Sequence, residues 1–538
     1  MNDEIHVLAN DLAIVIPILL DRGLFQSAKW ASELLDACPV DETNLDLPSY
    51  VPESATRLPS NPRKFLFAKS CFECKEYARA ANILEKFSHD PVLWFMGLYA
   101  KYLAGECKRD QDGELILGRN SSSSTPNTYC NDLIQQLEAR PEDVQNDPFL
   151  LYLHGTIALQ LNQHQTAIDS LIASINLFPY IWSAFVDLSR TITSVSHLAT
   201  VLDQINESPM KSIFRISIEQ ELAQHSPALV SSIESWQMAL PNSLFIQVQR
   251  ALVHYHSLEY QKAEALFDNI IKRDPFRIED LDVFSNILYI SGKAPKLSFL
   301  AQLTSSVDKL RPETCCIIAN FYSIRNNHIK AITYYRRALM LNRSYLSAWT
   351  LMGHEFVELK NSHAAIESYR RATDINRRDF RAWYGLGQAY EVLDMHYYSL
   401  SYYQRAVALK PQDPRMWHAV ASCYERLDRK EDAIKAFSRA LELTGPDPVM
   451  HYRLGLLYDS TDDRDNAITH MRAVLEFETE NDFVDEVSKA RLWLAKRALA
   501  DRDWAEAEEL AAGLLQGQQN DVEEARSIVR DVRQQRGK

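Results

Sequence analysis

Aromatic and small apolar residues return at a fixed interval along the second half of the chain. Trp349, Trp383 and Trp417 are each 34 residues apart, and aromatic residues recur at the same interval from Tyr322 to Tyr458. Between them, apolar residues lie three and four positions apart, the spacing of one face of an α-helix. A fixed interval of this length indicates stacked units, because a single helical pair cannot bury its apolar face alone.

The units share one internal order: Trp, then Leu or Met beside Gly or Ala, then an aromatic residue, Ala, a second aromatic residue and Ala. This order is the tetratricopeptide (TPR) signature of a helix–turn–helix. It predicts an all-α fold, a tetratricopeptide-repeat superhelix (α-solenoid) of roughly a dozen helical pairs. The unit that begins at Phe380 contains Trp383, Leu386, Gly387, Tyr390, Ser399, Tyr403, Ala406 and Pro411.

Domain organisation follows from where this pattern is regular. Residues 1–240 contain degenerate TPR-like repeats, which begin with a helical pair at Asp11–Pro39 and include a proline-rich linker at 40–62. Residues 105–131 have the composition of a disordered insertion. Residues 241–515 are predicted to form the C-terminal array with a peptide-binding groove, and residues 516–538 a capping helix and tail.

Composition narrows the range of partners. The chain has a net charge of −14, with 46% hydrophobic and 24% charged residues. An acidic chain argues against nucleic acid and anionic lipid as main partners and favours basic segments of other proteins. Eight cysteines without a framework suit a reducing compartment. The apolar run at residues 13–20 contains Pro17 and is too short to cross a membrane. We therefore expect a protein of the nucleus and cytoplasm.

Three short motifs could carry chemistry, and none is complete. Cys71 and Cys74 form a C-x-x-C without a second pair, so zinc is disfavoured. His354 and Glu355 begin an H-E-x-x-H motif, but Glu358 occupies the place of the second histidine. Gly385 and Gly387 follow no strand, so repeat packing explains them better than a nucleotide site. We expect no cofactor, no metal and no catalytic residues.

The expected functional surface is the groove lined by the first helix of each pair. Side chains not used for packing point into it, and acidic and amide groups dominate there. Such groups in a partly desolvated channel favour a peptide that carries Arg, although a solvated face is the alternative. The groove residues predicted from the spacing are Asn286, Tyr289, Asn320, His354, Tyr384, Gln388 and Glu391.

Several strings outside the repeat consensus resemble one TPR family. They are Gln26–Leu34, Asp274–Glu279, Phe284–Tyr289, Ala348–Glu355 and Arg378–Gln388. The resemblance is to the TPR scaffold subunit numbered eight of the anaphase-promoting complex, or cyclosome, a mitotic ubiquitin ligase.

This resemblance implies a non-catalytic homodimer that contacts other TPR and scaffold subunits and dimerises through its N-terminal repeats. It also implies that the C-terminal groove receives the Arg-containing C-box of coactivators. Asn320, together with Glu355, lies where the family places acceptors for that Arg.

Two other functions fit the sequence less well. A receptor for chaperone tails needs Lys or Arg in the groove, but the corresponding positions are Cys316, Thr350, Tyr384 and His418. An enzyme in which the repeats serve a catalytic domain needs a non-repeat domain, and no segment of this sequence has that pattern.

Overall fold

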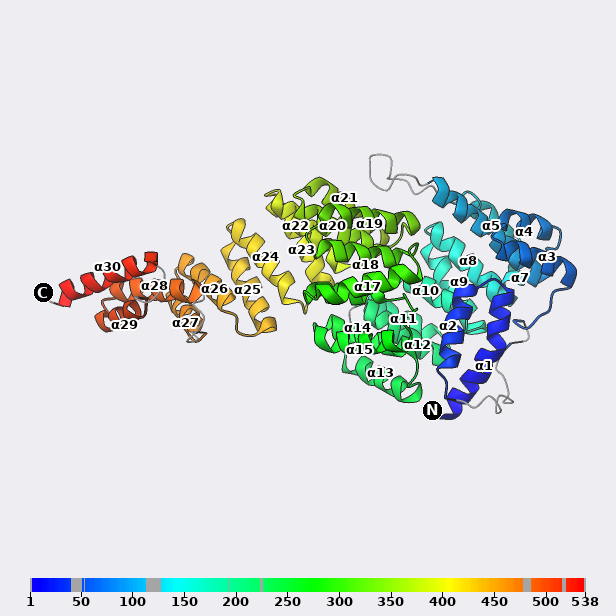
Figure 1. The fold of residues 1–538 in the computed structure, drawn as a ribbon, viewed down its shortest axis with the longest axis horizontal. Coiled ribbons are helices and arrows are strands. Elements are labelled where there is room, and N and C mark those ends of the chain that lie inside the picture. The colour runs from blue at the N-terminus through cyan, green and yellow to red at the C-terminus, as the bar shows by residue number, and fades with distance from the viewer. Residues whose placement is uncertain are drawn as a thin grey trace. The chain divides into compact units, whose positions relative to one another are not determined.

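The computed structural model describes residues 2–39, 51–52, 54–112, 127–192, 194–222, 226–477, 485–514 and 519–536. These residues form thirty α-helices and no β-strand (Figure 1). The predicted all-α class is therefore confirmed. None of the helices in this described part is long and apolar enough to cross a membrane.

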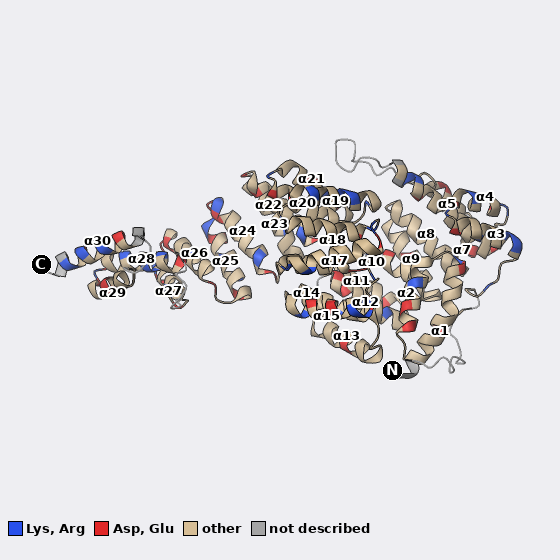
Figure 2. Cartoon of the chain, viewed as in Figure 1, with Lys and Arg blue, Asp and Glu red and all other residues tan. Residues whose placement is uncertain are grey.

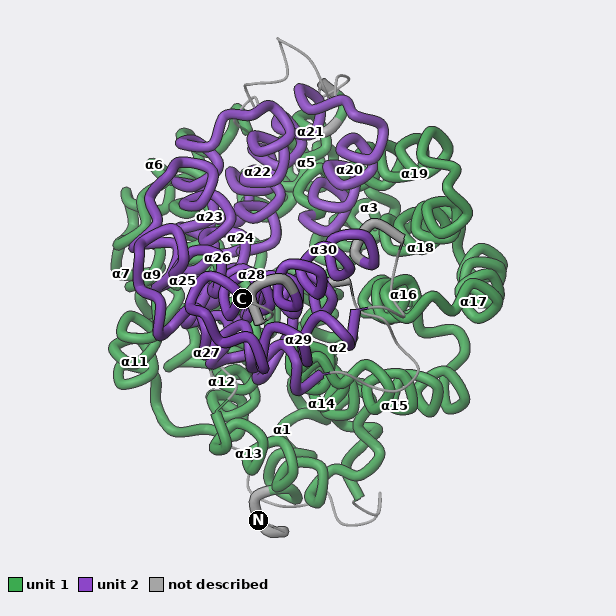
Figure 3. Tube along the Cα trace, turned by 90° about the vertical axis from the view of Figure 1, so that its left-hand side faces the viewer, with its two compact units in different colours: residues 1–345 green, residues 346–538 purple. Residues whose placement is uncertain are grey.

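The chain divides into two compact units, residues 1–345 (unit 1) and residues 346–538 (unit 2) (Figure 3). The sequence pattern had placed a division at residue 240 instead. Ile216 and Ile233 on one side of that point share an apolar core with Ile246 and Val253 on the other, so the helices before and after it pack together.

Unit 1 begins with thirteen helices of uneven length and spacing. They are α1 (Asn2–Asp21), α2 (Phe25–Asp36), α3 (Pro62–Glu73), α4 (Tyr77–Leu84), α5 (Pro91–Asp112), α6 (Cys130–Glu138), α7 (Pro141–Asn146), α8 (Pro148–Gln160), α9 (His164–Leu177), α10 (Trp182–Ser189), α11 (Val195–Gln204), α12 (Pro209–Glu221) and α13 (Pro227–Ala239).

Regular pairs follow. In unit 1 they are α14 (Leu244–His256) with α15 (Tyr260–Arg273), α16 (Leu281–Ile290) with α17 (Ala294–Val307), and α18 (Pro312–Ser323) with α19 (His328–Leu341). In unit 2 they are α20 (Leu346–Glu358) with α21 (Ser362–Ile375), α22 (Phe380–Val392) with α23 (His396–Leu409), α24 (Pro414–Arg426) with α25 (Lys430–Thr444), and α26 (Pro448–Ser460) with α27 (Arg464–Leu475).

Three helices complete unit 2: α28 (Asp485–Ala500), α29 (Trp504–Leu514) and α30 (Gln519–Arg536). The charged C-terminal segment forms the helix that the sequence predicts. Ala525, Ile528 and Val532 of α30 are buried in one core with Ala507 and Ala511 of α29.

The turn inside each regular pair has one residue in the left-handed region, with φ between +56° and +68°. After this residue, the next backbone N–H bonds back to the first helix; Asn361 donates to the Phe356 carbonyl at 2.8 Å. This arrangement satisfies carbonyls at the helix end. Seven residues at 34-residue spacing adopt it: Leu258, Gly292, Asn326, Lys360, Asp394, Asp428 and Asp462.

Buried tyrosine rings explain the glycines of the repeat. A Cβ on Gly353 would lie 2.5 Å from the ring of Tyr369, and one on Gly387 would lie 2.4 Å from the ring of Tyr403. Both tyrosines are fully buried. In these two pairs the first helix therefore lies against the ring at a point where it has no side chain.

The first two helices pack on a much later part of unit 1. Trp30 of α2 stacks on Trp182 of α10 with ring centroids 4.1 Å apart and planes 2° apart. Ser27 and Ser183 share a hydrogen bond of 2.6 Å, and the Tyr180 hydroxyl donates to Asp11 at 2.7 Å. The surroundings are nearly uncharged, since α8 to α10 carry few charged residues (Figure 2).

Ion pairs extend this contact. Arg277, in the turn before α16, pairs with Glu33 of α2, and Glu279 pairs with Lys29. The Arg277 side chain is only 8% exposed. The α1–α2 pair therefore connects to segments roughly 150 and 250 residues further along the chain.

Three boundaries differ from the sequence prediction. Helix α1 begins at Asn2 rather than Asp11 and continues through Pro17, whose ring faces solvent. The predicted insertion at 105–131 is shorter at both ends, because α5 continues to Asp112 and α6 begins at Cys130. Residues 113–126 and, in the predicted linker, residues 40–50 lie outside the described residues.

Replacing Gly387 with Ala should destabilise unit 2. The new methyl group would force the Tyr403 ring to move, and overpacking of this kind costs about 1–3 kcal/mol, against a gain of roughly 1 kcal/mol from the helix propensity of Ala. Urea denaturation followed by circular dichroism would measure the free energy of unfolding. Ser401→Ala, on the exposed side of α23, is the control and should have little effect. An unchanged midpoint for Gly387→Ala would contradict the packing described.

Replacing Leu258 with Gly should instead raise the free energy of unfolding. Leu258 adopts φ of +64° and its side chain is 45% exposed, so its removal relieves backbone strain and exposes little apolar surface. We expect a gain of about 0.5–1 kcal/mol in the free energy of unfolding. Gly292→Ala, at the equivalent turn with φ of +68°, should lose a similar amount. Equal stability of all three proteins would rule out strain at these turns.

Candidate functional site

The predicted groove residues lie on the first helices of four consecutive pairs. Asn286 and Tyr289 are on α16 and Asn320 is on α18, all in unit 1. The other five are on α20 and α22 in unit 2: His354, Glu355, Tyr384, Gln388 and Glu391. The two units are described separately.

In unit 1, Asn320 is the centre of a buried hydrogen-bond network and is 2% exposed. Its amide nitrogen donates to the Ser285 hydroxyl at 2.7 Å and to the Asn286 side-chain oxygen at 2.8 Å. Its oxygen accepts the hydroxyl of Tyr335 from α19. Both amide hydrogens are thus used inside the protein. Asn320→Ala would leave these partners unsatisfied, so it should lower stability, contrary to the expectation for a free acceptor in a groove.

Tyr289 is the accessible member of the unit 1 group. Its ring is 42% exposed, and its hydroxyl accepts a hydrogen bond of 3.3 Å from Ser323, which stands 34 residues later on α18. Asn320 and its partners therefore form a buried polar network, and Tyr289 presents an aromatic ring with a hydroxyl group at the surface.

In unit 2, His354 is paired with a buried tyrosine. The Tyr369 hydroxyl lies 2.8 Å from Nδ1 of His354. Burial, together with the nearby Arg381 guanidinium, lowers the pKa of His354 to about 4. The imidazole is therefore neutral at pH 7, so its Nδ1 can accept the Tyr369 hydrogen.

Glu391 is the partly exposed carboxylate of this surface. One oxygen accepts the hydroxyl of Tyr403 at 2.8 Å, and the other lies 3.8 Å from the guanidinium of Arg426, beyond hydrogen-bonding distance. Tyr384 lies beside the Tyr403 ring with centroids 5.3 Å apart. Gln388, also partly exposed, is on the same helix, and Glu355 of α20 is 5% exposed.

The tyrosines of the second helices were missed as functional residues. Tyr335, Tyr369 and Tyr403 recur at 34-residue spacing and donate to or pair with Asn320, His354 and Glu391. The repeat pattern assigned the aromatic residue of the second helix, such as Tyr403, to packing alone. The signal that could have revealed more is the choice of Tyr over Phe at three successive repeats, since a buried hydroxyl needs a partner.

The described residues contain no group of three or more His, Cys, Asp or Glu that could hold a metal. Cys71 is buried in α3, and Cys74 is exposed at the end of that helix.

Comparison with known families gives matches along most of the chain. The model described as anaphase promoting complex subunit 8 / Cdc23 matches residues 8–251. TPR models match residues 312–345, 353–393, 399–448 and 449–481, which confirms the predicted repeats there.

The chain is also similar to a solved structure described as the APC/C hetero-tetramer Cut9–Hcn1. The TM-score is 0.54 at 15% identity, with 89% of this chain and 98% of the other covered. At this identity the likeness shows the fold alone, a TPR fold over most of the chain.

Curated relatives come from plants, fungi and animals. Anaphase-promoting complex subunit 8 of Arabidopsis thaliana is 36% identical over 66% of this chain and 66% of its own length. Cell division cycle protein 23 homolog of Homo sapiens is 34% identical over 55% of this chain and 49% of its own length. Subunit CDC23 of Saccharomyces cerevisiae is 33% identical over 68% of this chain and 72% of its own length. The chain therefore belongs to the anaphase-promoting complex subunit 8 / Cdc23 family.

Proposed function

We propose that this chain is a non-catalytic scaffold subunit of an anaphase-promoting ubiquitin ligase, present in nucleus and cytoplasm, where it contacts other TPR and scaffold subunits. Family membership supports this proposal, together with the stacked pairs, since solenoids of this kind offer long surfaces to other proteins.

The same proposal assigns to its first helices the binding of an Arg-containing C-box from a coactivator. The observation that carries it is the state of Glu391: a partly exposed carboxylate, oriented by Tyr403 and only loosely approached by Arg426. A ligand guanidinium could take the place of Arg426 and form the closer, charge-assisted bonds that Arg prefers with carboxylates. The eight groove residues carry no positive charge at pH 7, because His354 is neutral, so they do not repel this ligand, and Arg426 is a cation that it would displace.

Glu391→Gln should weaken binding of a C-box peptide by about tenfold, roughly 1.4 kcal/mol, because the charge is lost while the Tyr403 hydrogen bond persists. Fluorescence titration of the full chain measures this. Glu431→Gln, which removes the same charge from the exposed first turn of α25, is the matched control and should bind normally. A peptide with its Arg replaced by norleucine should bind both wild type and Glu391→Gln weakly.

Purification of the tagged chain from cells separates the two parts of the proposal. Wild type and Glu391→Gln should both recover the other ligase subunits, and the variant should recover less coactivator. Loss of all subunits from both proteins would refute the scaffold role. Equal coactivator recovery together with equal peptide affinity would refute the C-box assignment.

We also propose that the chain is a homodimer through its N-terminal helices. Leu20, Phe25, Leu66 and Phe67 of α1 to α3 are exposed, Leu66 by 61%. The α2 and α3 members lie near one another, since Phe25 contacts Phe72 of α3 with centroids 6.2 Å apart. A second copy of the chain is the occupant that would bury this apolar surface.

Sedimentation of the full chain at tens of micromolar should give twice the mass of one chain. Leu66→Glu should shift the equilibrium toward monomer by at least tenfold, because it places a charge in the buried contact. Leu310→Glu, at a residue that is 71% exposed elsewhere in unit 1, is the control and should remain dimeric. A wild-type monomer would exclude this arrangement.

A further inference from the structure

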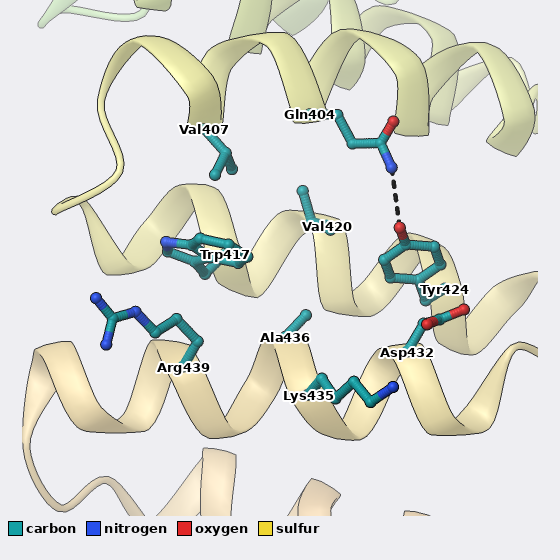
Figure 4. Close-up of a pocket in the computed structure, with 9 residues that line it drawn as sticks. All are labelled: Gln404, Val407, Trp417, Val420, Tyr424, Asp432, Lys435, Ala436 and Arg439. Atoms are coloured by element: carbon teal, nitrogen blue, oxygen red, sulfur yellow. Dashed lines mark hydrogen bonds between the residues drawn. The ribbon is translucent and has the colours of Figure 1, made fainter.

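Unit 2 contains a hollow of about 450 Å³ between α23, α24 and α25 (Figure 4). Val407, Val420 and Ala436 form its apolar base, and Trp417 and Tyr424 of α24 stand at its two ends. None of the eight predicted groove residues lines it. The lining is completed by Gln404, Asp432, Lys435 and Arg439.

The preceding repeat shows why the hollow exists. There, Tyr402 stands between Trp383 and Tyr390, with ring centroids 6.0 Å and 5.3 Å apart and planes tilted by 22° and 15°. Trp417 and Tyr424 are the equivalents of Trp383 and Tyr390, 34 residues later. The equivalent of Tyr402 is Ala436. The repeat thus retains two aromatic walls and lacks the ring that would stack between them.

Neighbouring repeats support this comparison. In the following one, His470 stacks on Tyr458 with centroids 5.4 Å apart and planes within 8°. No ring of the described residues stacks on Trp417 or Tyr424. Arg429 covers one face of Tyr424 at 5.0 Å, and Gln404 donates to the Tyr424 hydroxyl at 2.9 Å, so this ring is held in place. The indole nitrogen of Trp417 donates to the Pro411 carbonyl at 2.9 Å, so both walls are held before any ligand binds.

The rim of the hollow adds a charge preference. Lys435 is exposed and forms no ion pair with any described residue. Arg439 pairs with Glu442 at 2.7 Å, and Asp432, the acid on the rim, is already neutralised by Arg429 at 2.5 Å. In a chain with net charge −14, the unpaired Lys435 and the exposed Arg439 beside an apolar slot favour an acidic ligand.

We propose that this slot binds an aromatic side chain carried by an acidic segment of a partner protein. The ring enters over Ala436 and stacks between Trp417 and Tyr424, as Tyr402 does within the preceding repeat. Aspartate or glutamate residues on either side of the ring then approach Lys435 and Arg439. An aromatic anchor in a preformed pocket with a charged rim is the arrangement from which short segments gain most of their affinity.

Ala436→Tyr tests the proposal by supplying the missing ring from the protein itself. The probe is a fluorescein-labelled decapeptide with one central Phe, two Asp and two Glu beside it, and Gly and Ser elsewhere. Fluorescence anisotropy with the full wild-type chain should show binding, and Ala436→Tyr should weaken it at least tenfold. Its unfolding midpoint in urea should be unchanged or higher, because the slot is filled. Ala408→Tyr, which places the same ring on the exposed side of α23, is the matched control and should bind as wild type.

Peptide variants separate the two parts of the recognition. Replacing the central Phe with Ala should reduce affinity at least tenfold, and replacing the acids with Lys should do the same. Lys435→Glu should weaken the acidic peptide and restore part of the affinity of the lysine version.

The proposal is overturned if the Ala and Phe peptides bind wild type equally, if Ala436→Tyr binds the Phe peptide as tightly as wild type, or if the lysine peptide binds as well as the acidic one. Ala436→Leu narrows the slot with a smaller side chain. Should Ala436→Tyr fold poorly, normal binding by Ala436→Leu would equally count against the proposal, and at least threefold weaker binding would support it.

Discussion

The helical pairs α20–α21 and α22–α23 each close on a tyrosine ring that lies directly against a glycine of the first helix. Gly353 and Gly387 bring the first helix against the rings of Tyr369 and Tyr403, and both rings are fully buried. A ring buried in this way is held on all sides, so its hydroxyl has one available direction. That direction leads to the first helix, where His354 and Glu391 receive it.

The packing of the helices and the polar face of the repeats therefore depend on the same tyrosine rings. The ring that separates the helices also orients the side chain that a ligand would meet. Asn320 does not present its side chain to a ligand in this way. It is buried, and its amide group is hydrogen-bonded to Tyr335, Ser285 and Asn286. Glu391 also has a tyrosine partner, Tyr403, but its second oxygen remains near the surface. A ligand could therefore reach Glu391 but not Asn320.

The sequence predicted those structural features that recur at a fixed interval along the chain. Trp349, Trp383 and Trp417 located the helical pairs of the array, and the glycines beside them marked close approach. It did not predict the burial of Asn320, because an amide at a groove position looks like a solvated side chain until its partners are known. Nor did it predict that Trp30 stacks on Trp182, since the two residues belong to irregular segments with no shared period. The missing ring at Ala436 is visible in the sequence only once Tyr402 has been seen between its neighbours.

The packing of α2 on α10 also determines when the N-terminus can become structured during synthesis. Helix α2 leaves the ribosome well before Trp182 and Arg277 have been made. At typical elongation rates the delay is about ten to thirty seconds for the first contact and longer for the second. Throughout that interval the apolar face of α1 and α2 lacks the surface that later covers it, and local helix formation alone cannot bury it. The α1–α2 pair is thus made well before α10 and Arg277 and reaches its native contacts only after both have been made, so any factor that protects nascent chains would encounter its apolar face in that interval.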